Sequence, residues 1–379
     1  MCPVGPMPSL TGRITMREVA ARAGVHYSTV SLALRGRHEI PEPTRRRVCR
    51  AADELGYRPD PLLAALASYR HGRSPRGYRA TLAWLTNFPT RDAWRDEEIY
   101  REYFTGARDR AQALGFRLQE FWLREPGMTH LRASDILLAR GITGLLVAPQ
   151  PTPAESIALR WDRFCAVTIS HSLAHPRLHL VSPNQYRCVK LAVDELAARG
   201  YRRIGLVLLR SSDARVDHNW LAGYLVAQDC RAVRHRITPL QLDRWDTAAF
   251  GRWIERMRLD AVVSKCAAAL PALRELGYAV PRDLGLASLT RVKEGRVLSG
   301  VNESPEEAGA AAVEQLAGML HRNERGVPAS PRRLLIEGRW VDGATVRPLP
   351  ARGPLTAPPA SAPRSSRTRC SPSAPPGER

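Results

Sequence analysis

Residues 17–36 read REVAARAGVHYSTVSLALRG, with a short helical pattern on either side of a glycine. Thr15 and Glu18 stand in a T-x-x-E capping box, which predicts a first helix beginning directly after Thr15. Gly24 supplies the left-handed backbone that a tight turn requires, and a second helix is predicted over residues 27–34. Two short helices around a glycine turn are typical of a helix-turn-helix unit.

A third helix is predicted over residues 42–55, where Val48, Ala51, Ala52 and Leu55 recur on one face. Residues 11–60 carry ten arginines and six carboxylates, so positive charge is local to this unit. The second helix exposes small hydrogen-bonding or apolar groups, which suit base edges, thymine methyls and phosphates. They are Tyr27, Ser28, Thr29, Ser31 and Leu32. The pattern therefore predicts a DNA-binding headpiece.

The whole chain has 379 residues, a formal net charge of +20 and a pI of about 10.6. This balance favours an anionic partner such as nucleic acid, although only three lysines are present and an arginine-rich genome would produce the same charge. The seven cysteines are scattered and form no CxxC pair, which argues for a reducing compartment. No stretch resembles a signal peptide or a membrane span, so we expect a cytoplasmic protein without a membrane partner.

Changes in composition divide the chain into five parts. We expect a flexible leader, the helix-turn-helix headpiece, a hinge helix with a linker, an α/β core and a disordered Pro/Ser/Arg tail. Their predicted bounds are 1–12, 13–59, 60–78, 79–347 and 348–379. In the core, short apolar runs such as ATLAWL and RIGLVLL alternate with amphipathic helices, which indicates two parallel-sheet subdomains. The helices are predicted near 98–114, 130–140, 185–199, 217–230, 247–258, 267–277 and 305–322.

The pattern T-x-x-x-V-A-x-x-A-G-V-x-x-x-T-V-S over residues 15–31, followed by TRRRVCRAADELGYRP, resembles the headpiece of the lactose-repressor/galactose-repressor (LacI/GalR) family. The resemblance continues to about Val346. It implies a core like a periplasmic sugar-binding protein, and a homodimer that reads a palindromic double-stranded DNA operator.

The resemblance also implies roles for single residues of the headpiece. It places Tyr27, Ser28 and Leu32 at base-reading positions, and it makes Thr15, Thr29 and Ser31 phosphate contacts. His26 stands where the family usually has a serine that caps the recognition helix. A histidine there can contact phosphate, and we expect the weaker cap to loosen the helix by about 1 kcal/mol.

The segment DPLLAALASYR at 60–70 is an apolar helix too short to be stable alone in water. The resemblance makes it the hinge helix that folds on the operator, with Leu66 as the side chain that opens the minor groove. An ordinary connector helix, with Leu66 facing the core, is the alternative interpretation.

Polar and aromatic residues follow several predicted strands, where parallel sheets gather their ligands. We expect a small-molecule effector there, held by Asn87, Trp94, Gln150, Asn184, Asn219, Trp220 and Asn302. The sequence departs from the family at acidic and arginine positions of this cleft, since Pro183 stands where an Asp is common. The cleft would therefore take a different carbohydrate-related molecule, or none.

No P-loop and no G-x-S-x-G motif is present, so we predict no enzyme and no cofactor. His171, His175 and His179 have helical spacing, but Pro176 interrupts it, and we predict no metal site. The sequence thus predicts a homodimeric transcriptional regulator, most readily a repressor, controlled by a small-molecule effector. The alternatives are a solute-binding protein and a ligand-independent or architectural DNA-binding protein with a degenerate cleft.

Overall fold

The computed structural model describes residues 15–34, 40–55, 57, 80–153, 155–289 and 292–349. The predicted leader, the predicted hinge helix with Leu66, and the predicted tail beyond residue 349 lie outside the described residues. In the ranges that are described, no helix is both long enough and apolar enough to cross a membrane.

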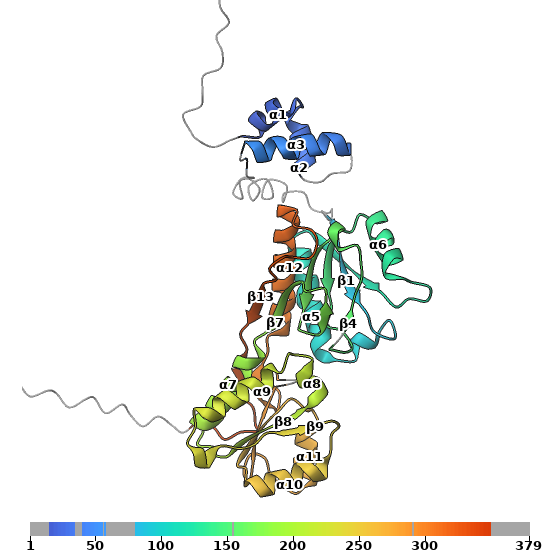
Figure 1. Ribbon diagram of the computed structural model, residues 1–379. Helices are drawn as coiled ribbons and strands as arrows, with labels where there is room; N and C mark the ends of the chain where they lie inside the picture. Colours follow the sequence, from blue (N-terminus) through green and yellow to red (C-terminus); the bar gives the residue numbers. More distant parts are fainter. Residues whose placement is uncertain are drawn as a thin grey trace, which may run out of the picture. The chain divides into compact units, whose positions relative to one another are not determined.

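The amino-terminal part consists of the helices α1 (Met16–Ala23), α2 (Tyr27–Leu34) and α3 (Glu42–Glu54) (Figure 1). The capping box is formed, since the Thr15 N–H donates to Glu18 Oε2 at 2.6 Å and the Glu18 N–H donates to Thr15 Oγ1 at 3.4 Å. Gly24 has φ +62° in the turn. The small core contains Val19, Ala20, Ala23, Val30, Ala33, Val48, Ala51 and Ala52. The predicted helix-turn-helix unit is confirmed.

The first subdomain of the core is an open, all-parallel six-stranded sheet in the order β13-β7-β5-β3-β1-β2. Its strands are β1 (Ala80–Thr86), β2 (Phe116–Trp122), β3 (Gly144–Val147), β5 (Cys165–Ile169), β7 (His179–Pro183) and β13 (Arg333–Ile336). Its helices are α5 (Glu98–Ala113), α6 (His130–Ala139) and α12 (Pro305–Arg322). The short elements are η1 (Ala93–Arg95), η2 (Trp161–Arg163) and the paired strands β4 (Glu155–Ser156) and β6 (Leu173–His175).

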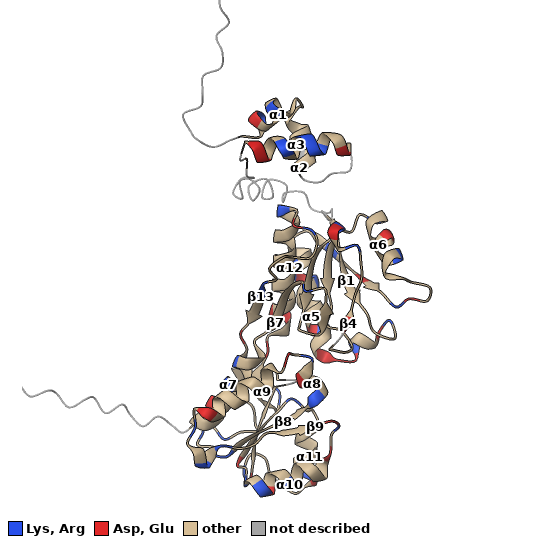
Figure 2. Ribbon diagram, in the orientation of Figure 1, with Lys and Arg blue, Asp and Glu red and all other residues tan. Residues whose placement is uncertain are grey.

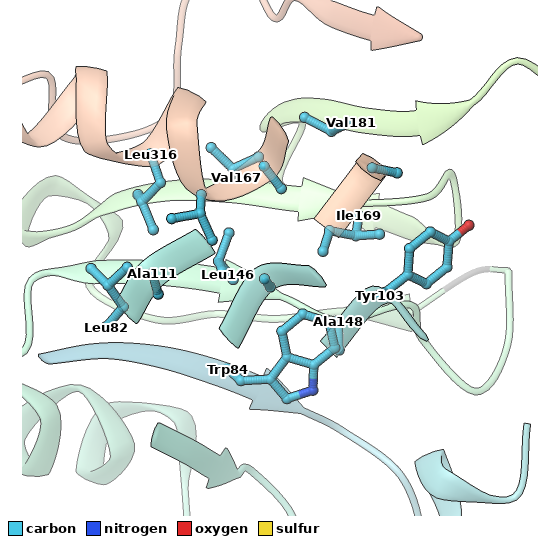
Figure 3. Packing of buried hydrophobic residues seen from close by; sticks show 14 of the residues in the cluster. Leu82, Trp84, Tyr103, Ala111, Leu146, Ala148, Val167, Ile169, Val181 and Leu316 are labelled. Atoms are coloured by element: carbon cyan, nitrogen blue, oxygen red, sulfur yellow. The ribbon is translucent and has the colours of Figure 1, made fainter. Parts of the chain in front are cut away.

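Alternate side chains of this sheet point to opposite faces, and helices cover both. On one face, Trp84 and Leu146 pack with Tyr103 of α5 and Leu316 of α12 (Figure 3). On the other face, α6 packs through a separate cluster that includes Leu137. Because both faces are buried, the strands read as continuous apolar runs rather than as an alternation.

The helices α5 and α12 approach each other closely through two glycines. A Cβ atom at Gly106 would lie 1.9 Å from the backbone oxygen of Glu306, and one at Gly309 would lie 2.1 Å from that of Tyr103. Only glycine permits this backbone approach. The two helices, about 200 residues apart in the chain, are therefore locked as a pair.

The second subdomain has a six-stranded sheet in the order β14-β12-β11-β10-β8-β9, in which only β14 is antiparallel to its neighbour. Its strands are β8 (Ile204–Leu209), β9 (Leu240–Leu242), β10 (Ala261–Ser264), β11 (Gly285–Ser288), β12 (Ser299–Asn302) and β14 (Arg339–Val341). Its helices are α7 (Gln185–Ala198), α8 (Arg210–Ala214), α9 (Asn219–Asp229), η3 (Val233–His235), α10 (Thr247–Met257) and α11 (Ala269–Glu275). One face packs against α7 and α9, the other against α10 and α11 (Figure 1).

The chain passes between the subdomains three times: from β7 to α7, from β12 to α12, and from β13 to β14. Each subdomain is therefore assembled from separated segments, and α12 and β13 complete the first one from the last third of the core. The predicted fold, a small all-α headpiece with an α/β core of two parallel-sheet subdomains, is confirmed, apart from the antiparallel edge strand.

Candidate DNA-binding surface and ligand cleft

The helix α2 presents the side chains that the sequence assigns to DNA. The Tyr27 ring is 52% exposed and Ser28 is exposed, while Thr29 and Leu32 are partly buried. Ser31 lies within α2, but its side chain is outside the described part of the chain. Small polar groups at a helix N-terminus can contact phosphates and base edges together.

Thr15 lies at the start of α1 rather than on α2, and its hydroxyl already hydrogen-bonds Glu18 Oε2 at 2.8 Å. The Thr15 side chain is therefore already engaged in capping α1. Around the helices, Figure 2 shows several arginines on α3, with acidic residues at its ends. Arg22 pairs with Glu54 at 2.7 Å, whereas Arg47 is exposed and available to an anion.

His26 forms the N-terminal cap of α2. Its carbonyl oxygen accepts hydrogen bonds from Thr29 at 2.9 Å and Val30 at 3.2 Å. Its Nδ1 lies 3.4 Å from the Ser28 backbone nitrogen, which donates to it, and 2.8 Å from Ser28 Oγ. The imidazole thus occupies the place of the usual capping oxygen. His26 therefore provides a side-chain cap, through a hydrogen bond of 3.4 Å, and the predicted loosening of the helix by about 1 kcal/mol stays a prediction.

At the carboxyl ends of the strands of the second subdomain, a buried polar network surrounds Trp220. The indole Nε1 donates to Glu303 Oε1 at 2.9 Å, and Lys265 Nζ donates to Glu303 Oε2 at 2.7 Å. The Lys265 ammonium lies 4.9 Å from the centre of the Trp220 ring and also donates to the Leu289 carbonyl at 2.8 Å. Since Glu303 is only 4% exposed, its charge is compensated within the protein.

Two of the side chains predicted to bind an effector, Asn184 and Asn302, lie where the chain crosses between the subdomains. Both hydrogen-bond groups of the protein itself. Asn302 Nδ2 donates to the Val292 carbonyl at 3.1 Å, and its Oδ1 accepts from the Ser304 N–H at 2.8 Å. Asn184 caps α7 through Oδ1 and donates from Nδ2 to Glu337 at 2.9 Å. These contacts position the connections between the subdomains, which can influence how a cleft opens.

Arg215, between α8 and α9, reaches the first subdomain. Its guanidinium donates to the carbonyls of Gln150 and Pro151 and to the Tyr100 hydroxyl. Gln150 is fully buried, and its Nε2 donates to the Ala148 carbonyl at 2.6 Å. The nearby Asn219 donates to its own turn, to the Val216 carbonyl at 2.5 Å.

Lys293 and Arg296 form a second bridge across the cleft. Lys293 Nζ lies 2.5 Å from Glu102 and 3.4 Å from Glu98, and Arg296 lies 3.9 Å from Glu98. The hydrogen bond to Glu102 raises the pKa of Lys293, so this ammonium is charged at neutral pH.

The space inside this cleft is about 30 Å³, room for little more than a water molecule. Asn302 and Glu303 contribute to its lining, together with Glu98, Ile99, Glu102, Lys265, Leu289, Val292, Lys293, Val301 and Pro305. Sites for small molecules usually measure roughly 300–1,000 Å³. Binding of a sugar-sized molecule here thus requires the bridging side chains to move.

The remaining two predicted residues lie elsewhere in the first subdomain. Trp94 is 1% exposed and packs against the rings of Trp84 and Phe104, within the hydrophobic core. Asn87 binds Arg124 and Glu155 at 3.1 and 3.2 Å, beside a separate open pocket of about 570 Å³. Neither side chain lines the small cavity that contains Asn302.

His171 follows β5, near the ion pair that Arg333 makes with Asp217 at 3.6 Å. Burial, with a smaller contribution from Arg333, lowers the pKa of His171 to about 4. The imidazole is therefore neutral at physiological pH. Among the described residues, no group of three His, Cys, Asp or Glu side chains could hold a metal ion.

Two domain families match the chain. Residues 15–60 match "Bacterial regulatory proteins, lacI family", and residues 193–346 match "Periplasmic binding protein-like domain". The chain therefore carries a DNA-binding domain of the lacI family followed by a periplasmic-binding-protein-like domain. The order of these two domains is the one that the structure displays, with the helix-turn-helix unit first and the α/β core second.

Individual relatives agree with this assignment. The HTH-type transcriptional regulator GntR of Pseudomonas aeruginosa is 52% identical over 58 residues, 15% of this chain and 17% of the relative, which is well under two thirds of that protein. The HTH-type transcriptional regulator IpsA of Corynebacterium glutamicum is 22% identical over 88% of this chain and 98% of the relative. A solved structure of a LacI-family protein from Rhizobium etli shares the fold with a TM-score of 0.54, at 15% identity, over 70% of this chain and 98% of that one.

Sequence reasoning missed the charged residues of the cleft. Lys265 and Glu303 directly follow the buried strands β10 and β12, and a charged residue at such a place was a usable signal. Arg215 carried no comparable signal, because it lies between the apolar run RIGLVLL and the helix predicted near 217–230, in a chain with many arginines.

Proposed function

We propose that this LacI-family regulator is a sequence-specific repressor that binds a palindromic DNA operator as a homodimer in the cytoplasm. The observation that carries the proposal is the helix-turn-helix unit itself, with a capped α2 that presents Tyr27 and Ser28 to solvent. One such unit reads half a site, so a two-fold dimer is needed for a palindrome.

The remaining parts have roles that follow from this proposal. The headpiece comprises residues 13–59, the linker 60–78 and the core 79–347, with the tail 348–379 outside the regulatory unit. In the linker, Leu66 would wedge into the minor groove at the centre of the operator. The protein acts as a regulator rather than as an enzyme, which agrees with the regulators among its relatives.

The core is the site of control. A small polar, carbohydrate-related effector would enter between the subdomains, contact Trp220, Asn302 and Glu303, and replace bonds that now cross the cleft. Asn184 and Asn219 would respond through the crossovers and the α9 turn rather than by direct contact. A ligand can shift the equilibrium only by its difference in affinity for the open and closed cores.

A second function is favoured by one observation, the cavity of about 30 Å³. The bridges from Arg215 to the Gln150 carbonyl and from Lys293 to Glu102 hold the cleft closed through contacts within the protein. Such a core would bind DNA independently of any effector.

The test of the function is selection of bound sites from a random DNA pool by the purified full-length protein near physiological salt. A palindrome supports the repressor, and a pool that stays random refutes sequence-specific binding. Thermal unfolding with a panel of sugars and sugar acids then distinguishes the two forms of control. An effector present at 100 times its Kd adds about 2.7 kcal/mol to the free energy of unfolding and so raises the unfolding temperature. An unfolding temperature that no compound raises supports the effector-independent form.

A further inference from the structure

The contact between His26 and Ser28 restricts what Ser28 can offer to DNA. Nδ1 of His26 accepts from the Ser28 backbone N–H at 3.4 Å. A backbone N–H can only donate, so Nδ1 must carry its lone pair, and the ring proton of the neutral imidazole is on Nε2. The tautomer of His26 is thus set by the start of α2.

The Ser28 hydroxyl lies 2.8 Å from the same nitrogen. Since Nδ1 has no hydrogen in this tautomer, the hydroxyl must donate its only proton to it. The outward side of Ser28 Oγ then holds lone pairs alone. Ser28 becomes an obligate hydrogen-bond acceptor, although a free serine can both donate and accept.

In the major groove, adenine and cytosine present an exocyclic amino group that donates, whereas guanine and thymine present only acceptors and a methyl group. We propose that His26 determines part of the operator sequence by fixing Ser28 as an acceptor, so that the base facing Ser28 is adenine or cytosine. His26 is here a positioning residue, since it acts on the base through Ser28.

The Tyr27 ring supports this arrangement. It lies 4.6 Å from the imidazole, centre to centre, at an interplanar angle of 51°. The two rings therefore contact each other at an otherwise exposed helix start. With Nδ1 engaged, the Nε2–H is left as the polar hydrogen of the His26 ring that can donate to a phosphate oxygen.

The inference rests on the proposed DNA-binding function, and site selection with four full-length variants separates the two. Ser28→Ala identifies the operator position that Ser28 reads, because the variant should select bases at that position without preference. The wild type should favour adenine or cytosine at that position by about tenfold, a discrimination common for one base contact. His26→Ala frees the Ser28 proton, so guanine and thymine should become acceptable and the preference should fall below about threefold.

Two further variants exclude a merely weakened helix. His26→Gly removes the ring but keeps a residue that tolerates the cap position, with little loss of helix stability. It should broaden the site as His26→Ala does. His26→Asn replaces Nδ1 by a carbonyl oxygen that also accepts, and it should restore the preference. Far-UV circular dichroism shows that each variant has folded helices.

Several results would overturn the inference. They are a wild-type preference for guanine or thymine at that position, an unchanged preference in both His26→Ala and His26→Gly, or no position altered by Ser28→Ala. A wild-type pool without any recovered site would instead overturn the proposed function on which the inference rests.

Discussion

Replacing Glu303 by alanine should cost about 3–5 kcal/mol of unfolding free energy, the range expected when one member of a buried ion pair is removed. The carboxylate is 4% exposed, and it accepts from the Trp220 indole at 2.9 Å and from the Lys265 ammonium at 2.7 Å. Without it, the indole N–H loses its acceptor, and Lys265 keeps only the Leu289 carbonyl and the ring face. The Lys265 side chain is only 15% exposed, so water restores little of the loss.

Urea unfolding, followed by tryptophan fluorescence and far-UV circular dichroism, measures this loss. Glu307 is exposed in the first turn of α12, four residues after Glu303, and Glu307→Ala should change stability by less than about 0.5 kcal/mol. Lys265→Met combined with Glu303→Met should cost less than Glu303→Ala alone, because no buried charge remains unpaired. A loss below about 1 kcal/mol for Glu303→Ala would refute the view that this network holds the cleft residues in place.

Three other perturbations test separate features. Gly106→Ala forces a Cβ atom against the backbone of α12 at Glu306, and it should lower the free energy of unfolding by about 1–3 kcal/mol in the same urea assay. In the control Gly318→Ala, the new Cβ atom meets only the flexible Arg322 side chain, so the change should be tolerated. The pKa of His171 is lowered to about 4, so its contribution is complete above the unfolded value near 6.5 and is lost as pH falls toward 4. Stability should therefore fall by about 2–4 kcal/mol more in the wild type than in His171→Gln over this window, and equal pH profiles would contradict the burial argument. Arg215→Met removes the bonds to two carbonyls and a hydroxyl, so the radius of gyration in X-ray scattering should increase; an unchanged radius would show that other contacts close the cleft.

The sequence was sufficient for the headpiece and the order of elements. Periodic alanines and valines around Gly24 predict α1–α3 correctly, because local capping and a small core decide them. The alternation of apolar runs and helices predicts both sheets, since strands buried on two faces are apolar throughout. The antiparallel direction of β14 was not predictable, because it depends on a third crossover rather than on side-chain pattern.

The cleft was predicted less well, for a physical reason. Trp94 and Trp220 look alike in sequence, yet one is core and the other hydrogen-bonds Glu303. Which face a side chain after a strand adopts depends on turns such as the one at His218, where φ is +56°. The bridge made by Arg215 joins residues 65 positions apart, a pairing that no local pattern contains.

The late contribution of α12 and β13 to the first subdomain has a consequence for synthesis. Ala308, Val313 and Leu316 fill the core that Trp84 begins, more than 200 residues earlier in the chain. While the ribosome is still translating the second subdomain, the first must wait with this apolar surface uncovered. Contacts of such long sequence separation form slowly, so a chain stalled before Pro305 would be a substrate for chaperones and proteases.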